Sequence, residues 1–278
     1  IRLALKAFKP KYVVLLNPDV KVTPGWLKEL IKCAEADPKV GIVGSKNLMW
    51  DGKTIDSVWH TFDYKTAVFK NIGHGEVDRG QYDGKRDVIS IQFSSVLIRR
   101  ELIKDIGLLD EGMFMSNEDC DYCYRARLYG WKVRYCPESL VYHYAGGSWL
   151  DRERSWRFHK YGVMHRIRHI VKNYEGWNAI KWTLFSIGDH FLHIIYGGIW
   201  GGIIRGRTRQ IQQVLTRSYS LLWNFLHLPD HMKARIQVQA ARRVKDKELF
   251  KYSISYFPPK PQAGLSLVQK ISEEARKL

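Results

Sequence analysis

Residues 12–16 form a continuous apolar run of strand length, and a polar segment follows it. Such a run is typical of a buried strand. Pro18 cannot continue a central strand, so we expect the strand to end before it. Asp19 is then presented at the carboxyl end of a buried strand, where open α/β sheets bind ligands. A carboxylate at this place suits a hard divalent cation that holds a phosphorylated substrate.

A helix is predicted from Ser116 or Asn117, either of which can cap it, to a point near Gly130. Asp121 and Arg125 are four residues apart in this segment, which is the spacing of a stabilising ion pair on one helix face. The pattern therefore predicts an amphipathic helix with a charged pair on one side.

Two carboxylates, Glu118 and Asp119, fall in the first turn of this helix, where negative charge suits the helix dipole. After the helix, residues 131–135 have the pattern of a strand. A second run of strand type, residues 140–144, follows Pro137 and contains His143. Each of these features alone is common in structural roles, but their order and context together point to a ligand site.

The second half of the chain has mainly helical patterns. Helices are predicted over residues 151–174 and 181–204, and an amphipathic helical stretch over 210–250 with a break at 228–230. Prolines after residue 257 end the packed part, and we expect residues 258–278 to form a mobile tail. The apolar positions of the amphipathic stretch include Ile211, Val214, Leu215, Leu221, Leu222, Phe225 and Leu226.

The charge of the chain is unevenly distributed. The net charge is +17, from 45 Lys and Arg against 28 Asp and Glu. Residues 1–150 hold 22 basic and 19 acidic residues, a difference of +3, and residues 151–278 hold 23 and 9, a difference of +14. This asymmetry indicates that the carboxyl-terminal part meets an anionic surface.

An apolar run rich in Gly and Trp covers residues 191–204, with arginines directly after it. Asp189, His190 and His193 interrupt its approach, and the run is shorter than the roughly 20 apolar residues of a spanning helix. We favour a segment that lies in the membrane interface, because basic residues beside Trp suit the headgroup region. The alternatives are a membrane-spanning helix and an ordinary buried helix pair with a solvated basic face.

Two other classes of function are disfavoured. The four cysteines show no secreted disulfide pattern, and Cys120 and Cys123 lie on the predicted helix without a second pair, which disfavours zinc. A basic chain with 13% aromatic residues could bind nucleic acid. No nucleic-acid motif appears, however, and the acidic clusters disfavour a phosphate-binding face, so no nucleic-acid partner is expected.

Residues 12–148 resemble the family 2 inverting glycosyltransferases with the GT-A fold, particularly the rhamnosyltransferase-like branch. The matching segments are 15–20, 40–44, 96–100, 106–111, Phe114, 118–121, Arg125, 130–131 and His143. The resemblance implies an α/β fold in which strands near 12–16, 40–44, 89–98 and 132–136 form one mixed sheet flanked by helices. Asp19, Asp119 and His143 are then expected to converge at the carboxyl edge of that sheet.

The resemblance also implies roles for individual residues. Asp19, in the sequence Asn17-Pro18-Asp19, matches the last acid of the family's metal motif, and Asn17 and Asp19 would bind the donor. His143 would complete a Mg²⁺ or Mn²⁺ site that neutralises the leaving diphosphate. Asp119, with Glu118 beside it, matches the general base that takes the proton of the acceptor hydroxyl.

A supporting set is expected around the acceptor. Asp121 and Arg125 follow the general base in the sequence, and Ser94 and Ser95 lie, after Phe93, where many relatives carry glycine and other small residues. The implied partners are a nucleotide-sugar donor, a glycan or lipid-linked acceptor and an anionic membrane surface. The implied place of action is the cytoplasmic face of the cell membrane, in cell-surface polysaccharide synthesis.

The domain organisation follows from the same resemblance. Residues 1–150 are expected to be the carboxyl-terminal portion of a GT-A catalytic domain, and residues 151–257 a basic, helical, membrane-associated region. Relatives carry strands and helices that bind the nucleotide before the strand at 12–16, so the resemblance implies an absent amino-terminal part. The alternative function is an inactive, membrane-associated binding protein derived from a transferase.

Overall fold

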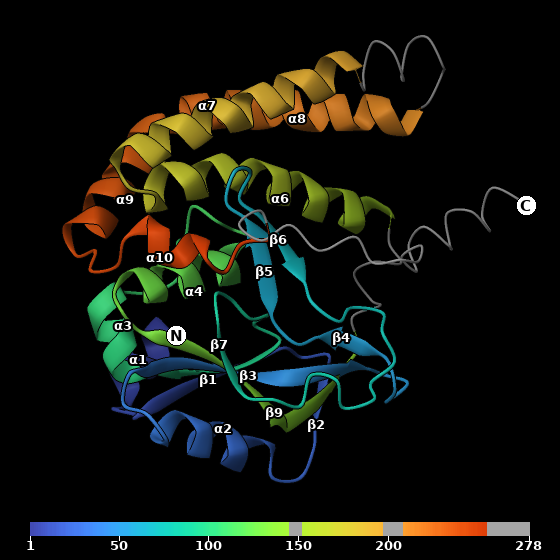
Figure 1. Cartoon of the computed structure of the whole chain (residues 1–278), viewed down its shortest axis with the longest axis vertical. Coiled ribbons are helices and arrows are strands. Elements are labelled where there is room, and N and C mark those ends of the chain that lie inside the picture. Colours follow the sequence, from blue (N-terminus) through green and yellow to red (C-terminus); the bar gives the residue numbers. More distant parts are fainter. Residues whose placement is uncertain (145–151, 197–207, 255–278) are drawn as a thin grey trace, which may run out of the picture.

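The computed structural model describes residues 1–144, 152–196 and 208–254. A mixed seven-stranded sheet forms the base of the molecule in Figure 1, and helices cover both of its faces. The strand order is β1-β8-β3-β9-β2, with β4 paired to β3 and β7 to β9. These strands are β1 (Tyr12–Leu16), β2 (Val20–Val22), β3 (Val40–Met49), β4 (Ile55–Ser57), β7 (Arg86–Val88), β8 (Ser95–Arg99) and β9 (Lys132–His143).

The centre of the sheet is the parallel pair β3 and β9, and the other pairings are antiparallel. The predicted mixed sheet is therefore confirmed. Gly44 of β3 is needed where it lies, because a Cβ there would come within 2.3 Å of the Ile91 side chain. The expected strand at 89–98 is shorter than predicted, since only its last part belongs to β8.

Two details of the strands differ from the sequence expectation. β1 borders the described sheet and is only half-buried, so it is not the fully buried strand that its apolar run predicted. The runs on either side of Pro137 are one strand, β9. The register between β3 and β9 shifts between Cys136 and Leu140, and this bulge accommodates the proline.

The two faces of the sheet have separate apolar clusters. The helix α2 (Trp26–Glu35) packs on one face, where Leu30 meets Val43 and Leu97. On the other face Ile42 and Ile98 belong to a larger cluster that includes α3 (Arg100–Ile106) and α4 (Glu118–Leu128). Neighbouring strand residues point to opposite faces, so β1, β3, β8 and β9 each supply both clusters.

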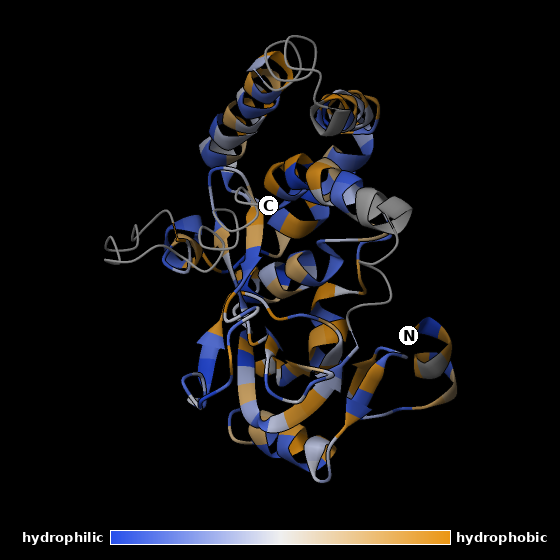
Figure 2. Cartoon of the chain, turned by 90° about the vertical axis from the view of Figure 1, so that its right-hand side faces the viewer, coloured by the Kyte–Doolittle hydropathy of each residue, from blue (hydrophilic) through white to orange (hydrophobic). Residues whose placement is uncertain are grey.

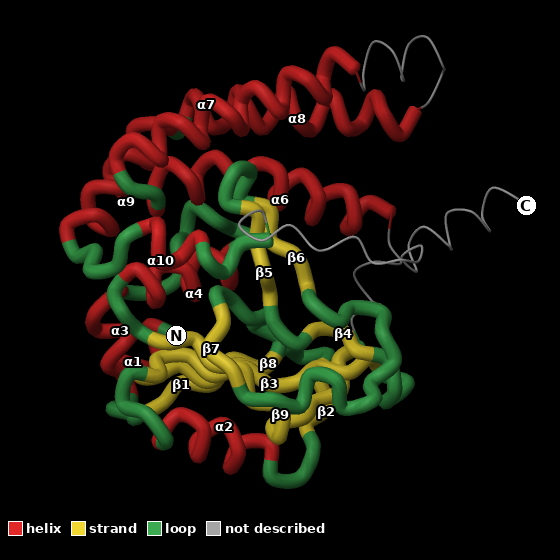
Figure 3. The backbone as a smooth tube through the Cα atoms, in the orientation of Figure 1, coloured by secondary structure: helices red, strands yellow, loops and turns green. Residues whose placement is uncertain are grey.

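The remaining helices form a layer above α4, shown in red at the top of Figure 3. They are α6 (Arg152–Asn173), α7 (Gly176–Leu192), α8 (Thr208–Leu226), α9 (Leu228–Ala240) and α10 (Asp246–Phe250). A short helix α1 (Arg2–Ala7) precedes β1, and β5 (His60–Asp63) pairs with β6 (Val68–Asn71) in a small separate sheet. The prediction of a helix at 151–174 and a break near 228–230 is confirmed.

The helical region shares its core with the α/β part. Tyr174, Trp182 and Phe250 belong to the same buried cluster as the sheet residues, and Phe250 stacks on Tyr64 with ring centroids 4.6 Å apart. The two parts therefore have no separate cores in the structure, and the expected domain boundary at residue 150 stays a prediction. The helix predicted at 181–204 begins earlier, at Gly176. Its residues 197–204 and the tail 258–278 lie outside the described residues.

Within the described part of the chain, none of the helices has the length and apolar character needed to cross a membrane.

Candidate active site

Asp19 and His143 are brought together at the end of β9. Val20 of β2 pairs with His143, and the Tyr144 N–H donates to the Asp19 carbonyl oxygen at 2.9 Å. This pairing places the Asp19 Oδ1 atom 3.4 Å from the His143 Nε2 atom. Asn17 lies in the turn before β2, where its backbone N–H donates to the Ser94 carbonyl oxygen. The expected neighbourhood of Asp19 and His143 is confirmed.

Asp56 completes this pair from the other side of the imidazole. Its Oδ2 atom lies 2.8 Å from His143 Nδ1, and its side chain is almost fully buried. Asp56 belongs to β4, which pairs with β3 next to β9. His74 Nδ1 also lies 2.7 Å from the Asp56 carbonyl oxygen. The sequence expectation did not include Asp56, because a single aspartate in a short strand carries no signal of its partner.

The two carboxylates control the charge of His143. Burial would lower its pKa, but the hydrogen bond and charge of Asp56, and the charge of Asp19, raise the pKa above its usual value. Asp56 holds Nδ1, so Nε2 is the nitrogen that faces Asp19. A carboxylate behind a histidine is the common support for a metal-ligating imidazole. Asp19 and His143 therefore fit a divalent cation that accepts oxygen and imidazole ligands, such as Mn²⁺.

The second part of the site is the start of α4. Ser116 and Asn117 both have left-handed backbone conformations, with φ of 66° and 70°. Asn117 stands at the expected cap position, but it forms no side-chain capping bond, which corrects that expectation. Its side chain instead donates to the Gly162 carbonyl oxygen of α6 at 3.1 Å. This turn leads directly into α4, of which Asp119 is the second residue.

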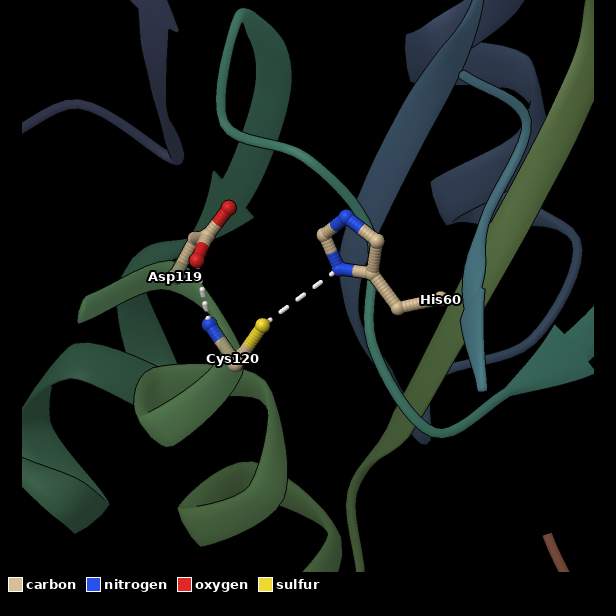
Figure 4. A group of neighbouring side chains, drawn as sticks. All are labelled: His60, Asp119 and Cys120. Carbon is tan, nitrogen blue, oxygen red and sulfur yellow. Dashed lines mark hydrogen bonds between the residues drawn. The ribbon is translucent and has the colours of Figure 1, made fainter. Parts of the chain in front are cut away.

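Asp119, Cys120 and His60 are neighbours, and Figure 4 shows Cys120 hydrogen-bonded to each of the other two. His60 Nδ1 lies 3.0 Å from Ser90 Oγ and 3.5 Å from Cys120 Sγ. One ligand atom from each of His60, Asp119 and Cys120 lies within 4.8 Å of the others. Burial raises the pKa of the Cys120 thiol well above its usual value, so the neutral hydrogen-bonded form is favoured over a thiolate metal ligand.

His60 feels the charge of carboxylates from both parts of the site. Burial lowers its pKa, while the charges of Asp119 and Asp56 act in the opposite direction. It therefore lies within electrostatic reach of both carboxylates. Contacts join Asp19, His143 and Asp56 in one group and His60, Asp119 and Cys120 in another. The expected convergence of Asp119 on Asp19 and His143 stays a prediction.

Glu118 differs from its neighbour Asp119. Burial, and then the charge of Asp119, raises the pKa of Glu118 to about 7. Its Oε2 atom is buried and has no hydrogen-bond partner among the described residues. The Asp119 Oδ1 atom accepts from the Cys120 N–H at 2.7 Å. The adjacent carboxyl groups thus have different environments, which is a common arrangement where protons are transferred.

The other predicted residues have partners inside the protein. Ser94 Oγ donates to Asn47 Oδ1 at 3.0 Å, and Ser95 Oγ lies 2.7 Å from Ser45 Oγ. Trp26 Nε1 also donates to Ser95 Oγ. Both serines are buried, so their hydroxyls hold strands together, and direct contact with an acceptor stays a prediction.

Asp121 and Arg125 form the predicted ion pair, with 2.9 Å between Arg125 Nε and Asp121 Oδ2. Lys172 of α6 lies 2.8 Å from the other Asp121 oxygen, and Arg125 donates to the Ile106 and Leu108 carbonyl oxygens. Burial would raise the pKa of Asp121, but the charges of Lys172 and Arg125 hold it well below its usual range. This group connects α4 to α6 and supports the helix that presents Asp119.

The chain is similar in sequence to known proteins. The chain is 28% identical over 198 residues to a pre-mycofactocin glycosyltransferase of Mycobacterium tuberculosis, which covers 66% of this chain and 38% of that protein. It is 24% identical over 224 residues to an N-acetylglucosaminyl-diphospho-decaprenol L-rhamnosyltransferase of the same species, over 73% of this chain and 68% of that protein. The chain thus spans less than half the length of the former relative.

A solved structure shows the fold. The crystal structure of GalNAc-T7 with UDP, GalNAc and Mn²⁺ superposes with a TM-score of 0.54 at 14% identity, covering 94% of this chain and 45% of that chain. This likeness supports the expected GT-A fold. The family model described as "Glycosyltransferase like family 2" matches residues 1–159, which contain Asp19, Asp56, Asp119 and His143. The chain therefore belongs to glycosyltransferase family 2.

Proposed function

We propose that this chain carries the catalytic machinery of a metal-dependent glycosyltransferase. The enzyme transfers a sugar from a nucleotide-diphosphate donor to a hydroxyl of a glycan or lipid-linked acceptor, with inversion at the anomeric carbon. The observation that carries the proposal is His143, whose Nε2 faces Asp19 while its Nδ1 is held by Asp56. The charges of Asp56 and Asp119 both act on His60, which supports the assignment of the two groups to one site.

Asp19 and His143 would hold the divalent cation, which supplies positive charge to the departing diphosphate. Asp119 takes the proton of the acceptor hydroxyl as the oxygen attacks the donor. Direct attack from the side opposite the leaving group inverts the anomeric carbon. Glu118, whose pKa is raised to about 7, is only partly ionised near neutral pH, which lessens the negative charge beside the base.

The names of the relatives support a role in cell-surface polysaccharide synthesis. One is a diphospho-decaprenol rhamnosyltransferase, and another is an O-antigen biosynthesis protein of Myxococcus xanthus that is 26% identical over 150 residues. A lipid-linked acceptor lies in a membrane, and the charge of +14 in residues 151–278 suits an anionic leaflet. We therefore place the reaction at the cytoplasmic face of the cell membrane.

The test is the release of nucleoside diphosphate from a panel of nucleotide sugars by the protein that contains this chain, with and without Mn²⁺. Asp119→Asn is expected to lower turnover by about 10²–10⁴-fold, because it removes the base. It should leave donor affinity within a few-fold. Asp37→Asn, at the far end of β9 from His143, is the matched control. Near-normal turnover of Asp119→Asn would exclude Asp119 as the base.

Asp19→Ala separates the metal role from the base role. It is expected to weaken Mn²⁺-dependent donor binding, because it removes one of the two ligands. If the metal dependence of donor binding is unchanged, the metal assignment of Asp19 is wrong. If no nucleotide sugar is bound or turned over under any condition, the alternative of a catalytically inactive binding protein replaces the enzyme.

A further inference from the structure

The helices α7 and α8 are amphipathic in the reverse sense to ordinary surface helices. The helix α8 and the second half of α7 bury polar residues, and both helices expose large apolar ones. On α8, Thr216, Ser220 and Asn224 are buried, and these residues recur at every fourth position. The exposed large side chains of the same helix are Ile211, Leu215, Tyr219, Leu222, Phe225 and Leu226. They lie on the opposite side of the helix, because they are offset from the buried row by about half a turn.

The helix α7 repeats this arrangement. Ser186 and His190 are buried on its inner side, together with Ala179 and Trp182. Its exposed large apolar residues are Trp177, Ile180, Leu184, Phe185, Phe191 and Leu192, followed by Ile195 and Tyr196 directly after the helix. Orange residues recur along both upper helices in Figure 2. We call the exposed apolar residues of 177–196 and 211–226 the apolar face.

Hydrogen bonds fix which side of each helix points inward. Asn224 Nδ2 donates to the Met164 carbonyl oxygen of α6 at 2.9 Å, so the polar row of α8 faces α6. The Ser220 Oγ atom lies 3.4 Å from His190 Nε2, which joins the polar rows of α8 and α7. Arg217 of α8 also pairs with Asp189 of α7 at 3.1 Å. Figure 1 shows α7 and α8 on the far side of α6 from the sheet. Because their polar sides are engaged inward, the exposed apolar residues of both helices lie on the outer side.

The apolar face has almost no charge. Among the exposed residues of α8 from 211 to 226, none is charged, and Lys181 is the single exposed Lys, Arg, Asp or Glu between 177 and 196. Contiguous exposed apolar surface on a globular protein marks an interaction site. Two helices whose inner polar rows are already paired need an apolar environment on their outer side.

We propose that the apolar face docks in the plane of an anionic lipid bilayer, with α7 and α8 lying along the headgroup boundary. Charge complementarity favours lipid over a second copy of the chain. The net charge of residues 151–278 is +14, which attracts an anionic leaflet and would repel the same region of another molecule. Trp177 and Tyr196 stand at the two ends of the α7 segment, and such side chains favour the membrane interface.

This inference specifies the surface by which the proposed enzyme reaches its membrane. It does not depend on catalysis, because the experiment contains no sugar donor. The full protein is sedimented with vesicles of phosphatidylglycerol and phosphatidylcholine, and with vesicles of phosphatidylcholine alone. We expect most of the protein to pellet with the anionic vesicles at low salt, and part of it to stay bound at high salt through the apolar contact.

The decisive variant is Leu184→Glu with Leu222→Glu, one change on the apolar face of each helix. Both leucines are more than half exposed, at 63% and 57%, so these substitutions spare the core. We expect vesicle binding to fall at least about a hundredfold, because two buried leucines are lost from the lipid contact. The matched control is Leu3→Glu with Val77→Glu, two exposed apolar positions on the α/β part, with the same change in charge.

Three outcomes would overturn the proposal. The first is that the wild-type protein stays in the supernatant with anionic vesicles at low salt. The second is that the two double variants lose binding equally, which would show attraction by charge alone. Alternatively, sedimentation velocity without lipid would show a dimer that Leu184→Glu with Leu222→Glu dissociates, which would make the occupant a second copy. Circular dichroism and thermal melting verify that both double variants are folded.

Discussion

Asp56 and His143 are 87 residues apart in the sequence, and they meet in a buried contact of 2.8 Å between Oδ2 and Nδ1. β4 and β9 lie on either side of β3, which makes this contact possible. The contact fixes the imidazole so that its free nitrogen faces Asp19. Asp56 is thus a positioning residue for the proposed metal ligand.

Replacing Asp56 by Ala should therefore weaken Mn²⁺ binding by about 10–100-fold, because the supporting carboxylate orients His143 and raises its basicity. The Mn²⁺ affinity of Asp56→Asn should fall between those of the wild type and Asp56→Ala, since asparagine keeps a hydrogen-bond acceptor without the charge. Isothermal titration with Mn²⁺ measures the affinity. Asp37→Ala is the control, because Asp37 pairs with Lys132 at the opposite end of β9. An unchanged affinity in Asp56→Ala would show that His143 does not bind the metal.

Glu118 predicts a pH dependence of stability. Burial, and then the charge of Asp119, raises its pKa from 4.5 to about 7 in the folded protein. The folded state then keeps a proton that the unfolded chain releases near pH 4.5, so the contribution of Glu118 to stability falls as pH rises toward 7. Its size is up to about 3 kcal/mol. Urea unfolding at pH 5 and pH 8 should show a smaller difference for Glu118→Gln than for the wild type.

Glu111→Gln serves as the comparison for Glu118, because the Glu111 side chain is 78% exposed. It should keep the pH dependence of the wild type. Equal pH dependence in Glu118→Gln and the wild type would mean that Glu118 ionises near its ordinary pKa.

The local patterns of the sequence predicted much of the sheet and the first turn of α4. A continuous apolar run, a proline and a capping position are properties of neighbouring residues, so β1, β9 and α4 could be placed approximately. Asp56 and His60 could not be found in this way. Their roles depend on the register of β4 against β3 and on the approach of β5 to α4, which are contacts between distant segments.

The helices of the second half show a different limit. The amphipathic pattern around Leu215 and Leu222 was recognised from the sequence, but a pattern does not say which side faces inward. The structure buries Ser220 and Asn224 because His190 and the Met164 carbonyl oxygen offer hydrogen-bond partners there. Such partners lie on other helices and become visible only once the packing is known.

Removing the charge of Asp121 should cause a large loss of stability. It is fully buried between Arg125 and Lys172, and its pKa is held well below the usual range despite the opposing effect of burial. Asp121→Asn removes the carboxylate partner of the buried Arg125 and leaves Lys172 with Asp110 as its acidic partner. It should cost about 3–5 kcal/mol in urea unfolding. The loss of this ion group should also appear in the wild type at low pH, as Asp121 takes up a proton.

Asp230→Asn is the appropriate control for Asp121. Asp230 also pairs with a buried cation, Arg168, but its own side chain is 57% exposed. Its replacement should cost less than about 1 kcal/mol, because water can take the place of an exposed carboxylate. If both variants lose the same stability, the group around Asp121 does not connect α4 to α6 in the way the packing indicates.

The packing of Phe250 indicates that the α/β part and the helical region unfold together. Its ring is nearly buried, and it stacks on Tyr64 of the α/β part while its centroid lies 5.1 Å from that of Tyr174. Phe250→Ala should cost about 3–5 kcal/mol, because it leaves a cavity in the shared cluster. Phe225→Ala, at a side chain that is 74% exposed, should change the stability of the lipid-free protein little.

Thermal unfolding followed by near- and far-ultraviolet circular dichroism should give one coincident transition, which Phe250→Ala shifts to lower temperature for both signals. Two separate transitions, of which Phe250→Ala shifts only one, would instead show that the chain divides into independent domains near residue 150. Two parts that share one core are expected to unfold in a single cooperative transition.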